Sequence, residues 1–115
     1  MPVDFTGTWR NQHGSILELQ VVDGTVSGRF ESGVGDDGQM HWVDVTGQTL
    51  GDVITFNAVY ASYGIVVAWI GQHTVGEGAG AIHTHWIHAT NLPDPGEKEW
   101  MWFSNRIGSD VFHRV

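Results

Sequence analysis

The chain of 115 residues contains no cysteine, which excludes disulfide bonds, zinc–thiolate sites and thiol catalysis. Basic residues are scarce: five lysines and arginines stand against thirteen acidic residues, for a formal charge of −8. Nucleic acids and anionic membranes require clustered basic side chains, so we expect neither as a partner. No apolar run reaches the roughly 18 residues that a membrane-spanning helix needs. The N-terminus, residues 1–4, has no basic segment followed by an apolar one, so we predict no signal peptide.

Glycine and tryptophan, in contrast, are abundant. Sixteen glycines indicate many tight turns, and 41% hydrophobic against 16% charged residues indicates a folded chain. The length fits a single domain, residues 1–115. Six tryptophans are enough to build a ligand pocket or an interface in addition to a core.

Alternating apolar and polar residues dominate the chain, whereas no stretch keeps a 3.6-residue period for three turns. Asp23-Gly24 is a strong hairpin signal. Short antiparallel strands in this number favour an all-β, eight-stranded up-and-down barrel, which has no free edges and can hold one small ligand; a flat sandwich fits the same pattern. The eight strands are predicted at about Phe5–Gln12, Ser15–Val22, Thr25–Ser32, Met40–Thr49, Val53–Ala61, Gly64–Thr74, Ala81–Thr90 and Glu99–Val115.

The outer faces of the predicted strands carry two further signals. Residues 65–70 are apolar on both faces, so the outer face of this strand predicts burial against a second subunit. His83 and His85 share one face of the next strand and fit a polar surface or a subunit interface. They also suit a metal, but no acidic residue or cysteine stands nearby in sequence to complete a site, so we predict none. Glu31 is expected on a solvated face and Arg106 on the inner face.

Five sequence blocks, in order and with compatible gaps, resemble the avidin and streptavidin family. They are GTWRNQHGS at 7–15, SGRFESGVG at 27–35, WIGQ at 69–72, THW at 84–86 and WFSNRIGSDVF at 102–112. The resemblance implies a barrel that binds biotin in its open end, as a homo-oligomer and without any other cofactor. It also implies a secreted or periplasmic location. The ligand contacts it implies, together with inward-facing residues beside them, are Asn11, Ser15, Phe30, Ser32, Val34, Gly35, Asp36, Ile65, Val67, Trp69, Trp86, His88, Trp102 and Asp110.

The resemblance also assigns roles to the polar residues of this set. Asn11 and Ser15 would donate to the ureido oxygen of biotin, and Ser32 and Asp110 would accept from its N–H groups. The alternation places all four on the inner faces of their strands, where small polar groups need partners or a ligand with matching donors and acceptors. Without a ligand we expect Asp110 to bond Asn11.

The tryptophans and one loop complete the assignment. Trp69 and Trp86 would enclose the bicyclic rings of biotin, and residues 34–36 would form a loop over the ligand. Trp102, eight residues before Asp110, would be the family's lid tryptophan, which reaches the pocket of a neighbouring subunit. Together with the apolar strand at 65–70, this tryptophan favours a tetramer over a dimer.

Several positions depart from the family pattern. Phe30 replaces a tyrosine that donates to the ureido oxygen, and Ala58 or Val59 replaces a pocket tryptophan. Ile65 and Val67 replace residues that bind the carboxylate and the sulfur of biotin. We therefore expect biotin to bind more weakly than in the best family members.

Two histidines suggest that the ligand could differ from biotin. His88 is predicted to point inward, where the family often has leucine, and His13 lies near the rim. The alternatives to biotin are a ligand with a different tail recognised by these histidines, an apolar ligand carried as in lipocalins, and an empty structural barrel. No catalytic triad, phosphate loop or cofactor motif is present, so we do not expect an enzyme.

Overall fold

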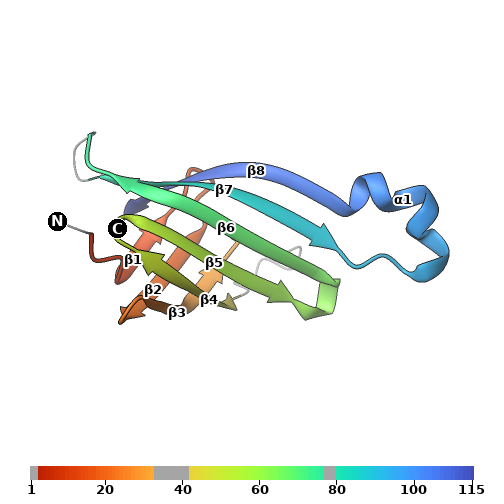
Figure 1. The fold of residues 1–115 in the computed structure, drawn as a ribbon, viewed down its shortest axis with the longest axis horizontal. Helices are drawn as coiled ribbons and strands as arrows, with labels where there is room; N and C mark the ends of the chain where they lie inside the picture. The colour runs from red at the N-terminus through yellow and green to blue at the C-terminus, as the bar shows by residue number, and fades with distance from the viewer. Residues whose placement is uncertain (1–2, 33–41, 77–79) are drawn as a thin grey trace.

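The computed structural model describes residues 3–32, 42–76 and 80–115. Within these ranges, eight antiparallel strands pair in sequence order, and the last pairs with the first to close a barrel (Figure 1). The predicted up-and-down barrel is confirmed, and the sandwich alternative is wrong. The strands are β1 (Gly7–Arg10), β2 (Ile16–Val22), β3 (Thr25–Glu31), β4 (Trp42–Leu50), β5 (Val53–Tyr60), β6 (Ile65–Thr74), β7 (Ala81–Thr90) and β8 (Asn105–Arg114).

The strand predicted over Glu99–Val115 is wrong in its first part. A 3-10 turn, η2 (Asp94–Gly96), leads there into the helix α1 (Glu97–Ser104), and β8 follows directly. Proline near the start of a helical turn and acidic residues in the first turn both favour a helix N-terminus, and the chain has both here. Residues 100–103 are all large and apolar, so they lack the alternation of a half-buried strand.

The hairpin predicted at Asp23-Gly24 is confirmed. Both residues have positive φ, 51° and 77°, as a two-residue turn of type I′ requires. This turn joins β2 to β3 in a register that pairs Val22 with Thr25. The register places Leu17, Leu19, Val26 and other apolar residues inside the barrel.

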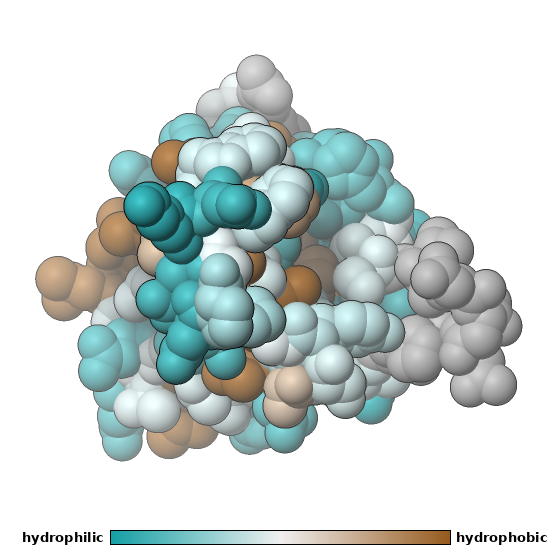
Figure 2. Space-filling view, turned by 90° about the vertical axis from the view of Figure 1, so that its right-hand side faces the viewer, coloured by the Kyte–Doolittle hydropathy of each residue, from teal (hydrophilic) through white to brown (hydrophobic). Residues whose placement is uncertain are grey.

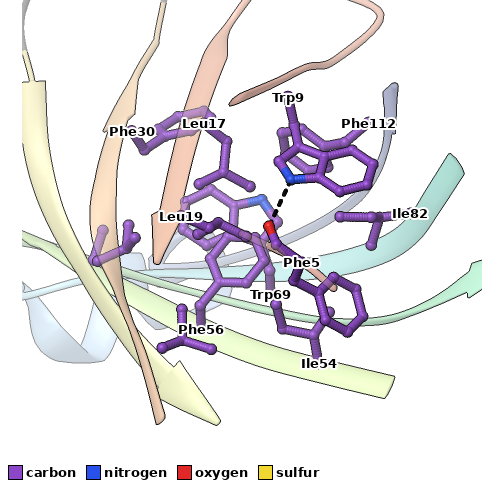
Figure 3. Packing of buried hydrophobic residues seen from close by; sticks show 13 residues of the cluster. Phe5, Trp9, Leu17, Leu19, Phe30, Ile54, Phe56, Trp69, Ile82 and Phe112 are labelled. Atoms are coloured by element: carbon purple, nitrogen blue, oxygen red, sulfur yellow. Dashed lines mark hydrogen bonds between the residues drawn. The ribbon is translucent and has the colours of Figure 1, made fainter. Parts of the chain in front are cut away.

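The hydrophobic core fills one end of the barrel (Figure 3). Trp9 is completely buried, and its indole Nε1 donates to the carbonyl of Phe5 at 2.9 Å. The guanidinium of Arg114 lies 4.2 Å from the centre of the Trp9 ring and donates to the carbonyls of Asp4 and Thr6. The segment before β1 is thereby held across this end of the barrel, which closes it.

The other end is open because the strands differ in length. β1 has four residues, whereas β6, β7 and β8 have ten each. These long strands project on one side toward α1, which gives the molecule extents of 51 × 30 × 26 Å (Figure 1). The 3-10 turn η1 (Ala61–Tyr63) between β5 and β6 lies at the same end. Among the described residues, no helix has the length and apolar character that spanning a bilayer requires.

One prediction of side-chain position is confirmed only as to the face, and one is wrong. Arg106 lies on the inner face as predicted, since it pairs with His88, but its side chain is exposed, with its guanidinium 4.4 Å from the centre of the Phe103 ring. It lies on the projecting part of β8, where the inner face of the sheet is open to solvent. Glu31 was expected in solvent but is only 3% exposed. Burial raises the pKa of Tyr60 to about 12, and the negative charge of nearby Glu31 contributes to the increase.

Candidate ligand-binding site

A cavity of about 580 Å³ occupies the open end of the barrel. Figure 2 looks at this end of the molecule and shows hydrophobic surface recessed behind a more hydrophilic front. Ten of the fourteen residues predicted from the sequence line the cavity, and they come from four strands (β3, β6, β7 and β8), from the turn between β1 and β2, and from the position after β3. These ten are Asn11, Ser15, Phe30, Ser32, Ile65, Val67, Trp69, Trp86, His88 and Asp110.

Asn11 is held in place by the tight turn between β1 and β2. Its Oδ1 accepts the backbone N–H groups of His13, at 3.0 Å, and of Ser15, at 2.9 Å. Because two backbone N–H groups donate to the same side-chain atom, that atom must be the amide oxygen. The orientation of the amide is therefore fixed, and Nδ2 remains as the hydrogen-bond donor of this side chain. Asn11 and Ser15 are 7% and 4% exposed. The turn therefore presents an amide donor and a hydroxyl at the cavity wall.

Asp110 is the acceptor of the site, and it is 6% exposed. Its Oδ2 accepts from the indole Nε1 of Trp69 at 3.1 Å, and its Oδ1 accepts from Nε2 of Gln12 at 3.2 Å. The predicted bond to Asn11 is wrong, because the side chains that donate to the Asp110 carboxylate are Trp69 and Gln12. Two donors occupy about half of the lone-pair positions of a carboxylate, so Asp110 keeps the capacity to accept from a ligand.

Gln12 fixes the position of this carboxylate. Besides Asp110, its Nε2 donates to the Ser109 carbonyl at 3.0 Å, and its Oε1 accepts from the Val111 N–H at 2.9 Å. These bonds join the turn after β1 to the middle of β8, on the two strands that close the barrel. The Asp110 carboxylate is thus held in position before a ligand binds, which lowers the entropic cost of ordering the site on binding.

Two tryptophans form aromatic walls. Trp69 is 3% exposed; its ring lies 5.1 Å from that of Phe30 and stacks on Phe56 at 4.9 Å. Trp86 is its register partner on β7 and is half-buried. A β-carbon at Gly108 would collide with the Trp86 indole, so glycine lets this ring lie against β8. The walls suit a flat or bicyclic apolar ligand.

Three positions where this chain departs from the family pattern lie on β5 and β6. Ala58 points inward and is buried, whereas Val59 points outward, so Ala58 stands where the family pattern has a pocket tryptophan. Ile65 and Val67 add apolar surface to the mouth. His88 lies beside Val67 in the register of β6 and β7, on the inner face as predicted.

Four predicted residues are not among those that line the cavity. Val34, Gly35 and Asp36 lie outside the described residues. Trp102 is on α1, 74% exposed, and does not line the cavity of its own chain.

Tyr60, Tyr63 and Ser109 line the cavity and were missed, and His13 lines it at the rim as predicted. The alternation that places Ala58 inward also places Tyr60 inward, so the sequence did carry a signal for Tyr60. Tyr63 lies in η1, where no strand pattern applies.

A metal site is not supported at the histidines of β7. In the three described stretches of chain, no group of three histidine or acidic side chains is placed to hold a metal ion. His83 and His85 are both exposed on the outer face of the barrel.

A comparison with models of protein families identifies the family of this chain. The model described as the Avidin family matches residues 1–115, the whole chain. The chain belongs to the avidin family. No curated protein sequence matches it. The family resemblance seen in five short blocks therefore extends over all 115 residues of the chain.

Solved structures agree on the avidin fold. The crystal structure of Xenavidin superposes with a TM-score of 0.83 at 22% identity, covering 100% of both chains. The X-ray structure of a biotin binding protein from chicken gives a TM-score of 0.84 at 24% identity, covering 99% of this chain and 98% of that one. At these identities the likeness establishes the barrel and its topology.

Proposed function

We propose that this avidin-family chain binds biotin in the open end of its barrel and catalyses no reaction. The observation that carries the proposal is the preformed polar group of Asn11, Ser15 and Asp110 beside the Trp69 wall. A urea offers one acceptor oxygen and two N–H donors. Asn11 Nδ2 and the Ser15 hydroxyl supply donors for the oxygen, and Asp110 supplies the acceptor for an N–H group. The chicken neighbour, described as a biotin binding protein, supports the same ligand.

The affinity is expected to fall below that of the best family members. Phe30 brings no hydroxyl to the polar group, and Ala58 brings no aromatic wall. An apolar-ligand carrier is disfavoured, because Asn11, Ser15 and Asp110 would then face a ligand that offers them no partners.

Calorimetric titration with biotin tests the proposal. One biotin per chain is the expected stoichiometry, with a rise in Tm on saturation because the ligand binds only the folded state. Pentanoic acid, which has a tail but no urea, is the matched control and should give neither heat nor a Tm shift. Absence of heat and of a Tm shift at millimolar biotin would refute the proposal.

The outer face of β6, β7 and β8 supports self-association. Val66, Ile70, Ile87 and Ile107 are 47–74% exposed there, and Ile87 pairs directly with Ile107 in the register of β7 and β8. Contiguous apolar surface of this kind marks an interface. The proposed assembly is a homo-oligomer, with a tetramer favoured over a dimer.

Sedimentation velocity tests the assembly. Ile107→Glu should lower the mass of the particle, because it buries a charge at the interface. Leu50→Glu changes a residue that is 81% exposed at the β4–β5 turn, and it should leave the mass unchanged. A wild-type particle with the mass of one chain contradicts self-association.

The proposed role of Trp102 is to cover the pocket of a neighbouring subunit. α1 exposes Trp100 and Trp102 at 50% and 74%, with their ring centres 6.1 Å apart. Trp102→Ala should increase the dissociation rate of biotin, whereas Trp100→Ala is the matched control and should leave it unchanged. Equal effects of the two variants would remove the special role of Trp102.

A further inference from the structure

The outer face of β6, β7 and β8 carries no charged side chain apart from histidine. The structure describes all three strands, and the aspartate, glutamate, lysine and arginine residues in them are Arg106, Asp110 and Arg114. All three stand at inner-face positions, since their register partners are buried or line the cavity. The chain as a whole has thirteen acidic residues and a formal charge of −8. Charged residues are depleted at the centre of protein interfaces, so this face has the composition of an interface centre.

His83 and His85 are exposed within this uncharged face. Both belong to β7, which has β6 on one side and β8 on the other. Their register partners on the two neighbouring strands are uncharged, namely Ile70, Gln72, Ser109 and Val111. Ile87 and Ile107 continue the face toward α1. The two imidazoles therefore sit where they can place a positive charge among uncharged neighbours.

The other titratable groups near these imidazoles lie at the margin of the face or on the opposite side of the sheet. His113 is near the closed end of β8 and pairs with Arg10 of β1, which is exposed, so charge returns at this edge. Asp110 faces the cavity, where its carboxylate accepts from Trp69 and Gln12. The charged residues of α1 lie beyond the other end of β7. On the outer face of the described strands β6, β7 and β8, no acid is placed to pair with either imidazole.

We propose that this face packs against the same face of a second copy while His83 and His85 are neutral, and that protonation of the two imidazoles separates the copies. The inference rests on the proposed self-association and adds its dependence on pH. A two-fold arrangement, the commonest in homo-oligomers, brings four of these imidazoles into one interface. Histidine changes its charge between pH 5 and 8, and a buried charge without a partner is unfavourable. Association below neutral pH then requires the release of protons to solvent, so it weakens as the pH falls.

Sedimentation velocity over a dilution series at pH 8.0 and at pH 6.0 tests the proposal. The dissociation constant of wild type should be at least about tenfold higher at pH 6.0. The general effect of acidification is the opposite, because the net charge falls as the pH approaches the pI of about 5.1 and repulsion between copies decreases. Circular dichroism at both pH values verifies that the protein stays folded.

Three variants locate the effect. The double variant His83→Gln/His85→Gln keeps polar side chains that cannot be charged, and it should associate equally at both pH values. His85→Lys carries a charge at both pH values and should separate the copies at pH 8.0 as well. His113→Gln is the matched control, because His113 lies at the charged margin beside Arg10, and it should keep the pH dependence of wild type.

Equal association of wild type at pH 8.0 and 6.0 overturns the inference but leaves self-association intact. The same holds if the double variant keeps the full pH dependence, or if His85→Lys associates at pH 8.0 as tightly as wild type. A wild-type particle with the mass of one chain at pH 8.0 overturns the proposed self-association as well.

Discussion

Replacing Phe30 by tyrosine should increase the affinity for biotin. Phe30 is 5% exposed, lines the cavity from β3 and lies with its ring 5.1 Å from Trp69 at an angle of 56°. The substitution keeps the ring and its packing and adds one hydroxyl. The family resemblance places a tyrosine hydroxyl at this position as a donor to the ureido oxygen. Phe30→Tyr therefore tests both the ligand and its orientation.

The size of the gain follows from one added hydrogen bond. A net contribution of about 0.5–1.5 kcal/mol corresponds to a decrease in Kd of roughly two- to twelvefold. The unliganded protein should change little in stability, because water in the open cavity can solvate the new hydroxyl. Calorimetric titration and thermal unfolding measure the two quantities separately.

Phe56→Tyr provides the control. Phe56 is completely buried, stacks against Trp69 and does not line the cavity. A hydroxyl at this position could not reach solvent, so Phe56→Tyr should lower the free energy of unfolding by about 1–3 kcal/mol. It should not raise the affinity for biotin. The reasoning is wrong if Phe30→Tyr folds with an unchanged Tm and binds biotin no more tightly than wild type.

Three further predictions concern the site. Gly108→Ala should displace the Trp86 indole, because overpacking costs about 1–3 kcal/mol. Titration should then show biotin binding about tenfold more weakly. Unchanged affinity would show that Trp86 does not contact the ligand. Asp110→Ala should weaken biotin on the order of a hundredfold by removing a charged acceptor, and a loss below threefold would contradict its role. Burial raises the pKa of Tyr60 to about 12, so the stability of the folded state is unaffected by this group below about pH 10 and falls as the pH rises through 12, because the unfolded chain loses the proton first. Tyr63→Phe leaves Tyr60 as the one tyrosine, and titration at 295 nm should give that midpoint rather than one near 10.

The strands and their inner faces could be predicted because alternation records which side of a sheet is buried. The prediction reached Asn11, Ser15, Trp69 and Asp110 on the cavity wall. It could not identify Gln12 as the partner of Asp110, since the two residues are 98 positions apart and meet only when the barrel closes. Long-range hydrogen bonds of this kind leave no local pattern in a sequence.

The sequence also could not predict how deep in the barrel each side chain lies. Arg106 and His88 share a register position, yet the Arg106 side chain is exposed and the His88 Nε2 is buried. Alternation gives the face of a strand but not whether other strands stand opposite that face. The helix α1 was missed for a related reason, because four large apolar residues in a row fit a buried strand as well as a helix.

The closed end of the barrel determines where this protein can be attached to other molecules. Val3 is held there by Asp52 Oδ1 at 2.9 Å, and the Val115 N–H donates to the Thr8 carbonyl at 2.9 Å. Val3 and Val115 thus lie at the end of a 51 Å long molecule that faces away from α1 and the cavity mouth (Figure 1). A fusion partner or a solid support joined at either end leaves the mouth uncovered, so the immobilised protein keeps its pocket accessible.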